Sequence, residues 1–413
     1  MPSERFSSSA GAILTMVGVA VGLGNVWRFP YMMGSYGGSA FLLIYLVFLV
    51  FLAMPAIMAE WGLGRGLRSG PVNAYQRTLG HRFGAVIGWV LVFAVFMADS
   101  YYVVVIGQIL TTSVAVTFNW KAQSNWPTIA ATGLIVVCTY WVLSRGLKRG
   151  IEAVSRVIVP FFLLAMVALA VRAWTLDGAT EAMAEFLKPD FSAIGATEVF
   201  AAMGQACFSL GLGGTLYVMY GSYLNKDQSL AKTAGWTAFG DVGAAIMASL
   251  FIVPAVLALG LNMAAGPGLL FNTLPQLFAE MASGPVLGLL FLLALGAVAF
   301  LSSLAAMEVV QHELKAHVPK LKNHAIGVSC GALAIAAIPP AVNPELIGTL
   351  DLIFGSGMLM FGCLMAVIAF GWGVPRLQAG EELGSRASVL LPWLRFVVPV
   401  AIGAILIGYL VSV

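Results

Sequence analysis

Long apolar stretches recur along the whole chain, and they constrain its fold more than any other feature. A helix that crosses a bilayer needs about 20 mostly apolar residues, and each stretch is long enough for that. We count eleven such stretches, at 10–33, 39–64, 84–114, 128–146, 151–176, 195–223, 234–261, 285–315, 323–341, 347–373 and 390–412. The sequence therefore predicts an all-α polytopic membrane protein with about eleven transmembrane helices.

The composition excludes most other classes of protein. Hydrophobic residues make up 60% of the chain and charged residues only 9%, whereas about 25% of the residues of a soluble domain are charged. The net charge of +3 implies no polyanionic partner, so we expect no binding of nucleic acid. No nucleophile–base set, phosphate loop or metal-ligand spacing is present in the sequence, which indicates neither an enzyme nor an organic cofactor.

Basic residues are distributed unevenly between the predicted spans. With a cytoplasmic N-terminus, 17 of the 21 Lys and Arg residues fall on the cytoplasmic side, all except Arg28, Lys121, Arg172 and Lys188. An odd number of spans then places the C-terminus outside. The short connecting segments are typical of a protein of the prokaryotic cytoplasmic membrane.

Two of the predicted spans are interrupted by glycine near their centres. The first carries Gly18, Gly22 and Gly24 directly before Asn25, and the sixth carries Gly-Leu-Gly-Gly at 211–214. Glycine favours unwinding, and unwound backbone at that depth persists only where it lines a cavity inside the protein. Paired breaks five helices apart therefore indicate a ligand site near the middle of the bilayer.

Several motifs resemble those of a known transporter family. They are 18–30 around the first break, 37–41, 60–65, Ser100-Tyr101-Tyr102, Gly204-Gln205 with Phe208-Ser209, Ser222-Tyr223 with 226–228, and 149–152. In these motifs the chain resembles the neurotransmitter:sodium symporter family. The resemblance implies the leucine-transporter fold with broken helices 1 and 6, its two inverted repeats of five helices lying within 10–176 and 195–373 and an extra helix at 390–412. It also implies alternating access, for which a monomer is sufficient.

The resemblance places a substrate site between the two breaks. The substrate carboxylate is expected at the backbone amides of Leu23 and Gly24 and the hydroxyl of Tyr102, because a helix N-terminus there supplies free N–H groups. The expected lining of the side-chain pocket is Ala98, Phe208, Gly211, Gly214, Ser302 and Ala306. Gly214 and Ala306 stand where relatives carry larger residues, so we expect room for a bulky apolar or aromatic side chain.

A first sodium site is also implied by the resemblance. Its expected ligands are the substrate carboxylate, the carbonyl of Ala20 and the side chains of Asn25, Ser209 and Asp241. All of them are hard oxygen ligands, and the shared carboxylate couples binding of the ion to binding of the substrate. Asp241 stands where many relatives have Asn, and its fixed negative charge is expected to remove any requirement for chloride.

A second sodium site matches the family less well. Its expected ligands are three carbonyls and one hydroxyl, from Gly18, Val21, Val298 and Ser302. The position that usually supplies Thr or Asp is Leu301, which cannot bind sodium. Either a shift of one residue brings Ser303 into the site, or the site is impaired and the number of sodium ions differs.

Two gates are expected to close the path to the site. The outer gate is expected to pair Arg28 with Asp351, the nearest acid on the tenth span. The inner gate is expected to join Arg5, Tyr223 and Glu313. An unpaired Arg inside a span is costly, which supports a functional role for Arg28.

Two further acids lie inside predicted spans. Asp99 is three residues before Tyr102 on one helix face, at a depth where an ionisable group indicates function. It is interpreted as a ligand for a substrate amino group or side-chain cation, as a proton carrier, or as a structural acid bonded to a neighbouring helix. Glu60 is expected to bond free backbone groups at the second break.

These features predict a chloride-independent symporter that moves a small amino acid with one or two sodium ions across a lipid bilayer. Two alternatives stay open. Leu301 and Asp99 are also compatible with a transporter of an amino acid or amine whose sodium coupling is weak or replaced by proton coupling. A substrate sensor that does not transport would use the same binding residues.

Overall fold

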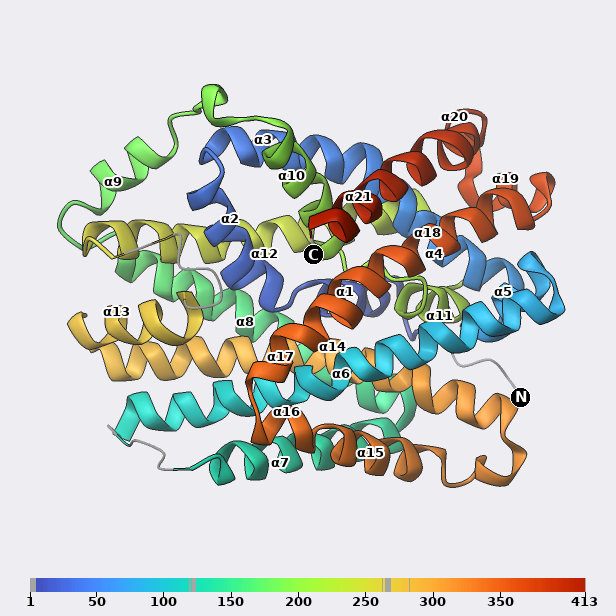
Figure 1. Ribbon diagram of the computed structural model, residues 1–413, viewed down its shortest axis with the longest axis horizontal. Coiled ribbons are helices and arrows are strands. Elements are labelled where there is room, and N and C mark those ends of the chain that lie inside the picture. The colour runs from blue at the N-terminus through green and yellow to red at the C-terminus, as the bar shows by residue number, and fades with distance from the viewer. Residues whose placement is uncertain are drawn as a thin grey trace.

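The computed structural model describes residues 5–118, 120, 124–261, 263, 269–281 and 283–412. Lys121, which entered the prediction of orientation, lies outside these ranges. The described residues form helices and connecting segments without any strand, and most of the long helices run along the longest axis of the molecule (Figure 1). The prediction of an all-α fold is confirmed.

Helices form within every predicted apolar stretch. In the described ranges nine helices are long and apolar enough to cross a membrane. They are formed by α3 (Ser39–Phe48) with α4 (Met54–Leu67), α6 (His81–Phe118), α7 (Trp126–Ser144), α8 (Glu152–Ala173), α12 (Leu230–Ala258), α14 (Gly284–His317), α15 (Ala325–Ala336) with α16 (Ile338–Val342), α17 (Glu345–Leu350) with α18 (Met358–Ile368), and α19 (Arg376–Leu383) through α20 (Ala387–Pro392) to α21 (Val398–Ser412).

Two further spans are broken near their centres. The first broken span consists of α1 (Ser9–Ala20) and the segment Gly24–Ser35, which ends in α2 (Phe29–Ser35). The two halves are bent by 60° relative to each other. The second broken span consists of α10 (Ala196–Ser209) and α11 (Leu216–Tyr223), which are separated by 210–215. The first pair adds a tenth candidate span to the nine other helices of the described chain, and the second pair occupies the sixth predicted stretch.

Local hydrogen bonds stabilise both breaks. At the first, the backbone N–H of Gly22 donates to Asn25 Oδ1 at 3.0 Å. At the second, Gly211 and Gly214 have φ values of 67° and 71°, a left-handed conformation that glycine adopts without strain. The backbone N–H of Gly213 donates to Glu60 Oε1 at 3.1 Å, which confirms the role predicted for Glu60.

Four shorter helices lie at the two ends of the bundle. α9 (Ala179–Phe186) and α13 (Leu274–Glu280) lie at the end drawn on the left of Figure 1, whereas α5 (Pro71–Leu79) and α19 lie at the opposite end. Between these ends, α1 packs against α8, α12 and α14. The first broken span is therefore enclosed by other helices, so its unwound backbone does not face lipid.

Candidate functional site: the cavity between the two broken helices

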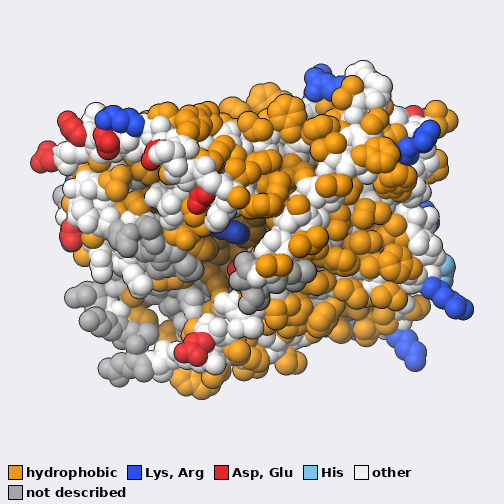
Figure 2. All heavy atoms as spheres, turned by 45° about the horizontal axis from the view of Figure 1, so that its top comes forward, with side chains coloured by type: hydrophobic (Ala, Val, Ile, Leu, Met, Phe, Trp, Pro, Cys, Tyr) orange, Lys and Arg blue, Asp and Glu red, His pale blue; other side chains and the backbone are white. Residues whose placement is uncertain are grey.

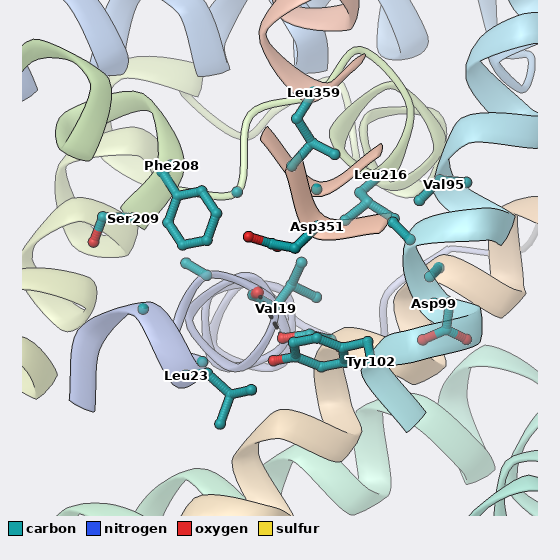
Figure 3. A pocket seen from close by; sticks show the side chains of 18 of the residues that line it. Val19, Leu23, Val95, Asp99, Tyr102, Phe208, Ser209, Leu216, Asp351 and Leu359 are labelled. Atoms are coloured by element: carbon teal, nitrogen blue, oxygen red, sulfur yellow. Dashed lines mark hydrogen bonds between the residues drawn. The ribbon is translucent and has the colours of Figure 1, made fainter. Parts of the chain in front are cut away.

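The two breaks face each other across a cavity of about 160 Å³. A Cβ atom built on Gly211 would lie 4.0 Å from the carbonyl oxygen of Val19. Figure 3 shows Tyr102 and Phe208 on different sides of this cavity, with α6 supplying Tyr102 and α10 supplying Phe208. An outer cavity of about 540 Å³ adjoins it and shares Leu23 among its lining residues, and one face of the molecule is hollowed near its centre (Figure 2).

All but one of the residues predicted for the substrate site line the inner cavity. They are Leu23, Gly24, Ala98, Asp99, Tyr102, Phe208, Gly211, Ser302 and Ala306. Gly214 is the exception, because its carbonyl accepts a hydrogen bond of 2.7 Å from the Tyr75 hydroxyl and its Cα faces the backbone of Gly362. The expectation that Gly214 widens the pocket is therefore corrected.

Several apolar residues that the sequence analysis missed complete the wall. Val95, Leu216 and Leu359 all line the cavity. Helical spacing was the available signal for one of them, because Val95 lies one turn before Ala98 and Asp99 on α6. Leu216 and Leu359 add bulky apolar side chains to a wall that also contains the small residue Ala306.

The anchoring end of the cavity lies at the first break. The second half of the span begins at Gly24, and Leu23 directly precedes it. Backbone N–H groups at the start of a helix lack partners within the helix. A Cβ atom built on Gly22 would lie 3.2 Å from the Tyr102 hydroxyl oxygen and 3.5 Å from Ser302 Oγ. Amides and hydroxyls thus converge at the position predicted for the substrate carboxylate.

The side chains predicted for the first sodium site lie together. The amide of Asn25 donates to Asp241 Oδ1 at 2.6 Å and to Ser209 Oγ at 3.2 Å. The Ser209 hydroxyl donates to Asp241 Oδ2 at 2.7 Å, and Tyr45 Oη lies 3.5 Å from the same oxygen. Ala20 lines the cavity beside Asn25 and Ser209.

The chemistry of this group fits a sodium ion. Asp241 has an exposed fraction of 0%, and in the described residues no basic side chain forms an ion pair with it. A buried carboxylate without a cation is unfavourable. The carboxylate of Asp241 and the hydroxyl of Ser209 are hard oxygen ligands of the kind that sodium needs, and a cation beside them would supply the missing charge.

Hydrocarbon occupies the position predicted for a second sodium site. A Cβ atom built on Gly18 would lie 2.6 Å from Leu301 Cδ1, so the leucine side chain packs against the backbone of α1. The Ser303 hydroxyl donates to Asp99 Oδ2 at 3.1 Å and thus points toward α6. Ser302 donates to the carbonyl of Val19 at 3.2 Å. The alternative in which Ser303 enters the site therefore has no support in this geometry.

Two more residues predicted for that site, Val21 and Val298, were expected to bind sodium through their backbone carbonyl oxygens. Val21 directly follows α1, and Val298 lies on α14 about one turn before Leu301. Both side chains are buried. Leu301 differs from them because its side chain stands where a side-chain ligand was expected.

Comparison with known proteins identifies the family. A sequence model of the sodium:neurotransmitter symporter family matches residues 3–132 and 112–367. The chain belongs to this family. The symporter is 32% identical to the uncharacterised sodium-dependent transporter YhdH of Bacillus subtilis, over 74% of this chain and 71% of that relative. It is 27% identical to an uncharacterised sodium-dependent transporter of Haemophilus influenzae, over 98% of both chains.

A solved structure supports the same fold. The crystal structure of MhsT in complex with L-phenylalanine superposes on the symporter with a TM-score of 0.86 and 31% sequence identity, covering 98% of this chain and 99% of that one. The symporter is therefore a sodium-dependent membrane transporter with the leucine-transporter fold, and it is not an enzyme.

The two residues predicted for the outer gate of the symporter line the same outer cavity. The guanidinium of Arg28 lies over the Phe208 ring, with 4.1 Å between the guanidinium carbon and the ring centroid. The Tyr101 hydroxyl donates to Asp351 Oδ1 at 2.8 Å. Arg28 and Asp351 form no ion pair in the described part of the chain. Their pairing in a closed outer gate stays a prediction.

The inner gate of the symporter is assembled differently from the prediction. Glu313 Oε2 lies 3.1 Å from His317 Nδ1, whereas Arg5 is exposed and forms no ion pair with any described residue. The Tyr223 hydroxyl donates to Glu308 Oε1 at 2.6 Å. Glu308, and not Glu313, is therefore the acid that meets Tyr223.

The residue after Arg5 explains this difference. Phe6 is buried, and its ring packs against Tyr220 and Tyr223 with centroid distances of 6.1 Å and 6.2 Å. Its backbone N–H donates to the carbonyl of Tyr223 at 3.4 Å. The N-terminal segment thus attaches to α11 through an aromatic residue, and the guanidinium beside it stays in solvent.

A buried ion pair joins two helices at the same end of the molecule. Arg65 Nε, at the end of α4, donates to Glu382 Oε2 of α19 at 2.5 Å, and the two side chains are only 4% and 9% exposed. Arg65 Nη1 also donates to the carbonyl of Gln228 at 2.5 Å. Gln378 of α19 donates to the carbonyl of Gly66 at 2.9 Å. This network connects α4 and α19 to the segment that follows α11.

Proposed function

We propose that this symporter moves a neutral amino acid with a bulky apolar or aromatic side chain, driven by one sodium ion and without chloride. The observation that carries the proposal is the cavity between the breaks, which combines an anion-binding end at Leu23, Gly24 and Tyr102 with a mostly apolar wall. The MhsT complex with L-phenylalanine supports an amino acid as the substrate class.

The size of the cavity supports a side chain of moderate bulk. Its volume is about 160 Å³, and an apolar cavity of about 150 Å³ holds a benzene molecule. Val95, Leu216 and Leu359 supply apolar contacts along the wall. A single aromatic ring or a branched aliphatic group would therefore fill the space.

The ion requirement follows from two side chains. Asp241 places a fixed negative charge beside Asn25 and Ser209, which supports sodium binding there and independence of chloride. Leu301 places hydrocarbon against Gly18, which supports a stoichiometry of one sodium ion. The bias of basic residues supports a cytoplasmic N-terminus and an external C-terminus.

Thermal stability of the purified symporter tests this proposal. A ligand that binds only the folded state stabilises it by about 2.7 kcal/mol when present at 100 times its Kd. We expect Leu, Met, Phe, Tyr or Trp to raise the melting temperature in sodium chloride and equally in sodium gluconate, but not in choline chloride. An equal rise in choline chloride would contradict sodium coupling and favour proton coupling.

Uptake into proteoliposomes then separates transport from sensing. Under an inward sodium gradient we expect the amino acid identified by the thermal shift to accumulate inside the vesicles. Vesicles in which sodium is equal on both sides serve as the control. Binding without accumulation would identify the protein as a sensor.

Leu301→Thr is expected to create a second sodium site. The substitution replaces the isobutyl group that packs against Gly18 of α1 with a hydroxyl, which is a hard oxygen ligand. Since a Hill coefficient cannot exceed the number of sites, we expect it to rise from about 1 for sodium in the natural protein toward 2 in the variant. Uptake measured against sodium concentration gives both values.

Leu301→Ala is the matched control for this test. It removes the same hydrocarbon but adds no ligand, so its Hill coefficient should stay at that of the natural protein. A natural protein whose uptake already rises with the square of the sodium concentration would contradict the proposed stoichiometry.

A further inference from the structure

The last helix of the chain packs against two helices that carry the walls of the inner cavity. α21 contacts α18 and α10, which supply Leu359 and Phe208 to that wall (Figure 1). A Cβ atom built on Gly204 of α10 would lie 3.8 Å from Ile405 Cγ2 of α21. The described residues of α21 line neither cavity themselves. This helix can therefore act on the site only through the helices that it contacts.

The acid predicted for the outer gate lies in a π-helical turn, Asp351–Gly357, directly before α18. In such a turn an N–H group bonds the carbonyl five residues earlier, as Met358 does with Ile353. A π-helical turn is rare and often marks a functional site. Gly355 lines the inner cavity, Ser356 the outer one and Asp351 both. The position of this turn therefore affects the gate and both cavities.

Tyr409 of α21 contacts both ends of the turn. Its hydroxyl donates to the carbonyl of Leu352, the residue directly after Asp351, at 2.5 Å. Its ring packs at the other end, since a Cβ atom built on Gly357 would lie 3.3 Å from Tyr409 Cε1. One side chain of the last helix thus holds the backbone on which the gate acid stands.

The turn is held while the predicted gate is unpaired. Asp351 accepts a hydrogen bond of 2.8 Å from Tyr101, and Arg28 lies over the ring of Phe208. In the part of the chain that the structure describes, Asp351 forms no ion pair. A movement of the turn that carries Asp351 toward Arg28 also takes the carbonyl of Leu352 away from α21. The hydrogen bond from α21 therefore favours the unpaired arrangement.

Two tyrosine hydroxyls bond the turn in different ways. Tyr101 of α6 donates to the side chain of Asp351 and thus to the gate acid itself. Tyr409 donates only to backbone, at the next residue. Replacement of Tyr101 would change the chemistry of the acid, whereas replacement of Tyr409 changes only how firmly its backbone is held.

We propose that Tyr409 is a positioning residue of the outer gate, which favours the open gate by holding the backbone beside Asp351. The proposal rests on the predicted pairing of Arg28 with Asp351. It depends neither on which amino acid is carried nor on the number of sodium ions. The helix outside the two predicted repeats then takes part in transport through one hydrogen bond.

Access to the outer cavity of the purified full-length symporter tests this proposal. Gln108 lines this cavity together with Arg28 and Asp351, so pairing of the two gate residues narrows the path to a thiol introduced by Gln108→Cys. The measurement is the rate at which a water-soluble maleimide labels that thiol, in sodium chloride without amino acid. Cys138→Ala removes the one natural cysteine of the described chain that is not buried.

Tyr409→Phe is expected to slow this labelling. The variant keeps the ring on Gly357 and loses only the hydroxyl that bonds Leu352. A hydrogen bond between neutral groups changes an equilibrium by about 2- to 10-fold, so the ratio of open to closed gates should fall by that factor. Gly357→Ala would place a methyl group against the ring of Tyr409, and it provides a second variant with the same expected effect.

Two controls separate gating from packing. Asp351→Asn removes the charge that pairs with Arg28, so labelling should be fast and Tyr409→Phe should no longer slow it. Ile405→Val loosens the contact of α21 with α10 without touching the turn, and it should leave the labelling rate unchanged. The melting temperature of each variant shows whether it is folded.

Three results would overturn the inference. Equal labelling of the natural protein and Tyr409→Phe would show that the hydrogen bond does not bias the gate. Slowing by Tyr409→Phe that persists in Asp351→Asn would assign the effect to another part of the molecule. Slower labelling of Asp351→Asn than of the natural protein would remove the predicted gate pair and the inference together. The proposed function is tested separately, because sodium-dependent binding of an amino acid does not depend on these rates.

Discussion

Asp241→Asn is expected to lower the apparent affinity for sodium by about 10- to 100-fold, because the carboxylate contributes the charge of the proposed ion site. The variant keeps the size of the side chain but loses the negative charge that faces Asn25 and Ser209. No other acidic side chain of the described chain is hydrogen-bonded to these two residues. Sodium-dependent melting temperature and uptake give the affinity.

The same variant is expected to acquire a dependence on chloride. Tyr45 and Ser209 remain as donors beside the lost charge, and the side-chain amide of Gln205, one turn earlier on α10, has no hydrogen-bond partner in the described structure. These groups suit an anion. We expect uptake by Asp241→Asn to be higher in sodium chloride than in sodium gluconate, and uptake by the natural protein to be equal in the two salts.

A matched control and a contrary outcome complete this test. Asp190 is an exposed acid outside the spans, and Asp190→Asn should change neither the sodium affinity nor the response to chloride. Unchanged sodium affinity in Asp241→Asn would place the ion elsewhere and would remove the basis for chloride independence.

Arg65→Ala is expected to reduce the free energy of unfolding by about 3–5 kcal/mol, the usual effect of leaving one member of a buried ion pair alone. Glu382 would keep its charge at 9% exposure without the guanidinium, and the carbonyl of Gln228 would lose its donor. We expect a lower melting temperature in detergent, together with easier proteolysis of the segment that contains α19.

Lys188→Ala provides the comparison for this prediction. Lys188 pairs with Glu185 at 2.5 Å, but the two side chains are 71% and 75% exposed, and such surface pairs contribute about 0–1 kcal/mol. The double variant Arg65→Ala/Glu382→Ala should regain part of the lost stability, because it leaves no charge unpaired. An equal effect of Arg65→Ala and Lys188→Ala would contradict the role of burial.

The long apolar stretches and the glycine clusters predicted most of the fold. Gly22, Gly24, Gly211 and Gly213 mark both breaks, because a break requires residues that are compatible with unwound backbone. The acceptor that stabilises the second break, Glu60, could also be predicted, since an acid inside a span needs donors. Local composition was sufficient for these features.

Contacts between distant segments could not be predicted in the same way. Gly214 and Gly211 belong to the same glycine cluster. Only the tertiary structure shows that Gly214 faces Tyr75 and that Gly211 lines the cavity. Glu308 and Glu313 lie on one helix, and only the packing of α11 against α14 shows that Tyr223 meets Glu308, whereas Glu313 lies beside His317 of its own helix. Arg5 was assigned by analogy, and the burial of its neighbour Phe6 decides its position.

The leucine side chain that packs against Gly18 has an electrical consequence. A carrier that moves one sodium ion with a zwitterion transfers a single positive charge in each cycle. For one charge, 100 mV of membrane potential is worth about 2.3 kcal/mol, or roughly 50-fold accumulation of the substrate. A second ion would square that ratio, so with the proposed stoichiometry of one sodium ion Leu301 would limit how steeply this carrier concentrates its substrate and would halve the current that each molecule carries inward.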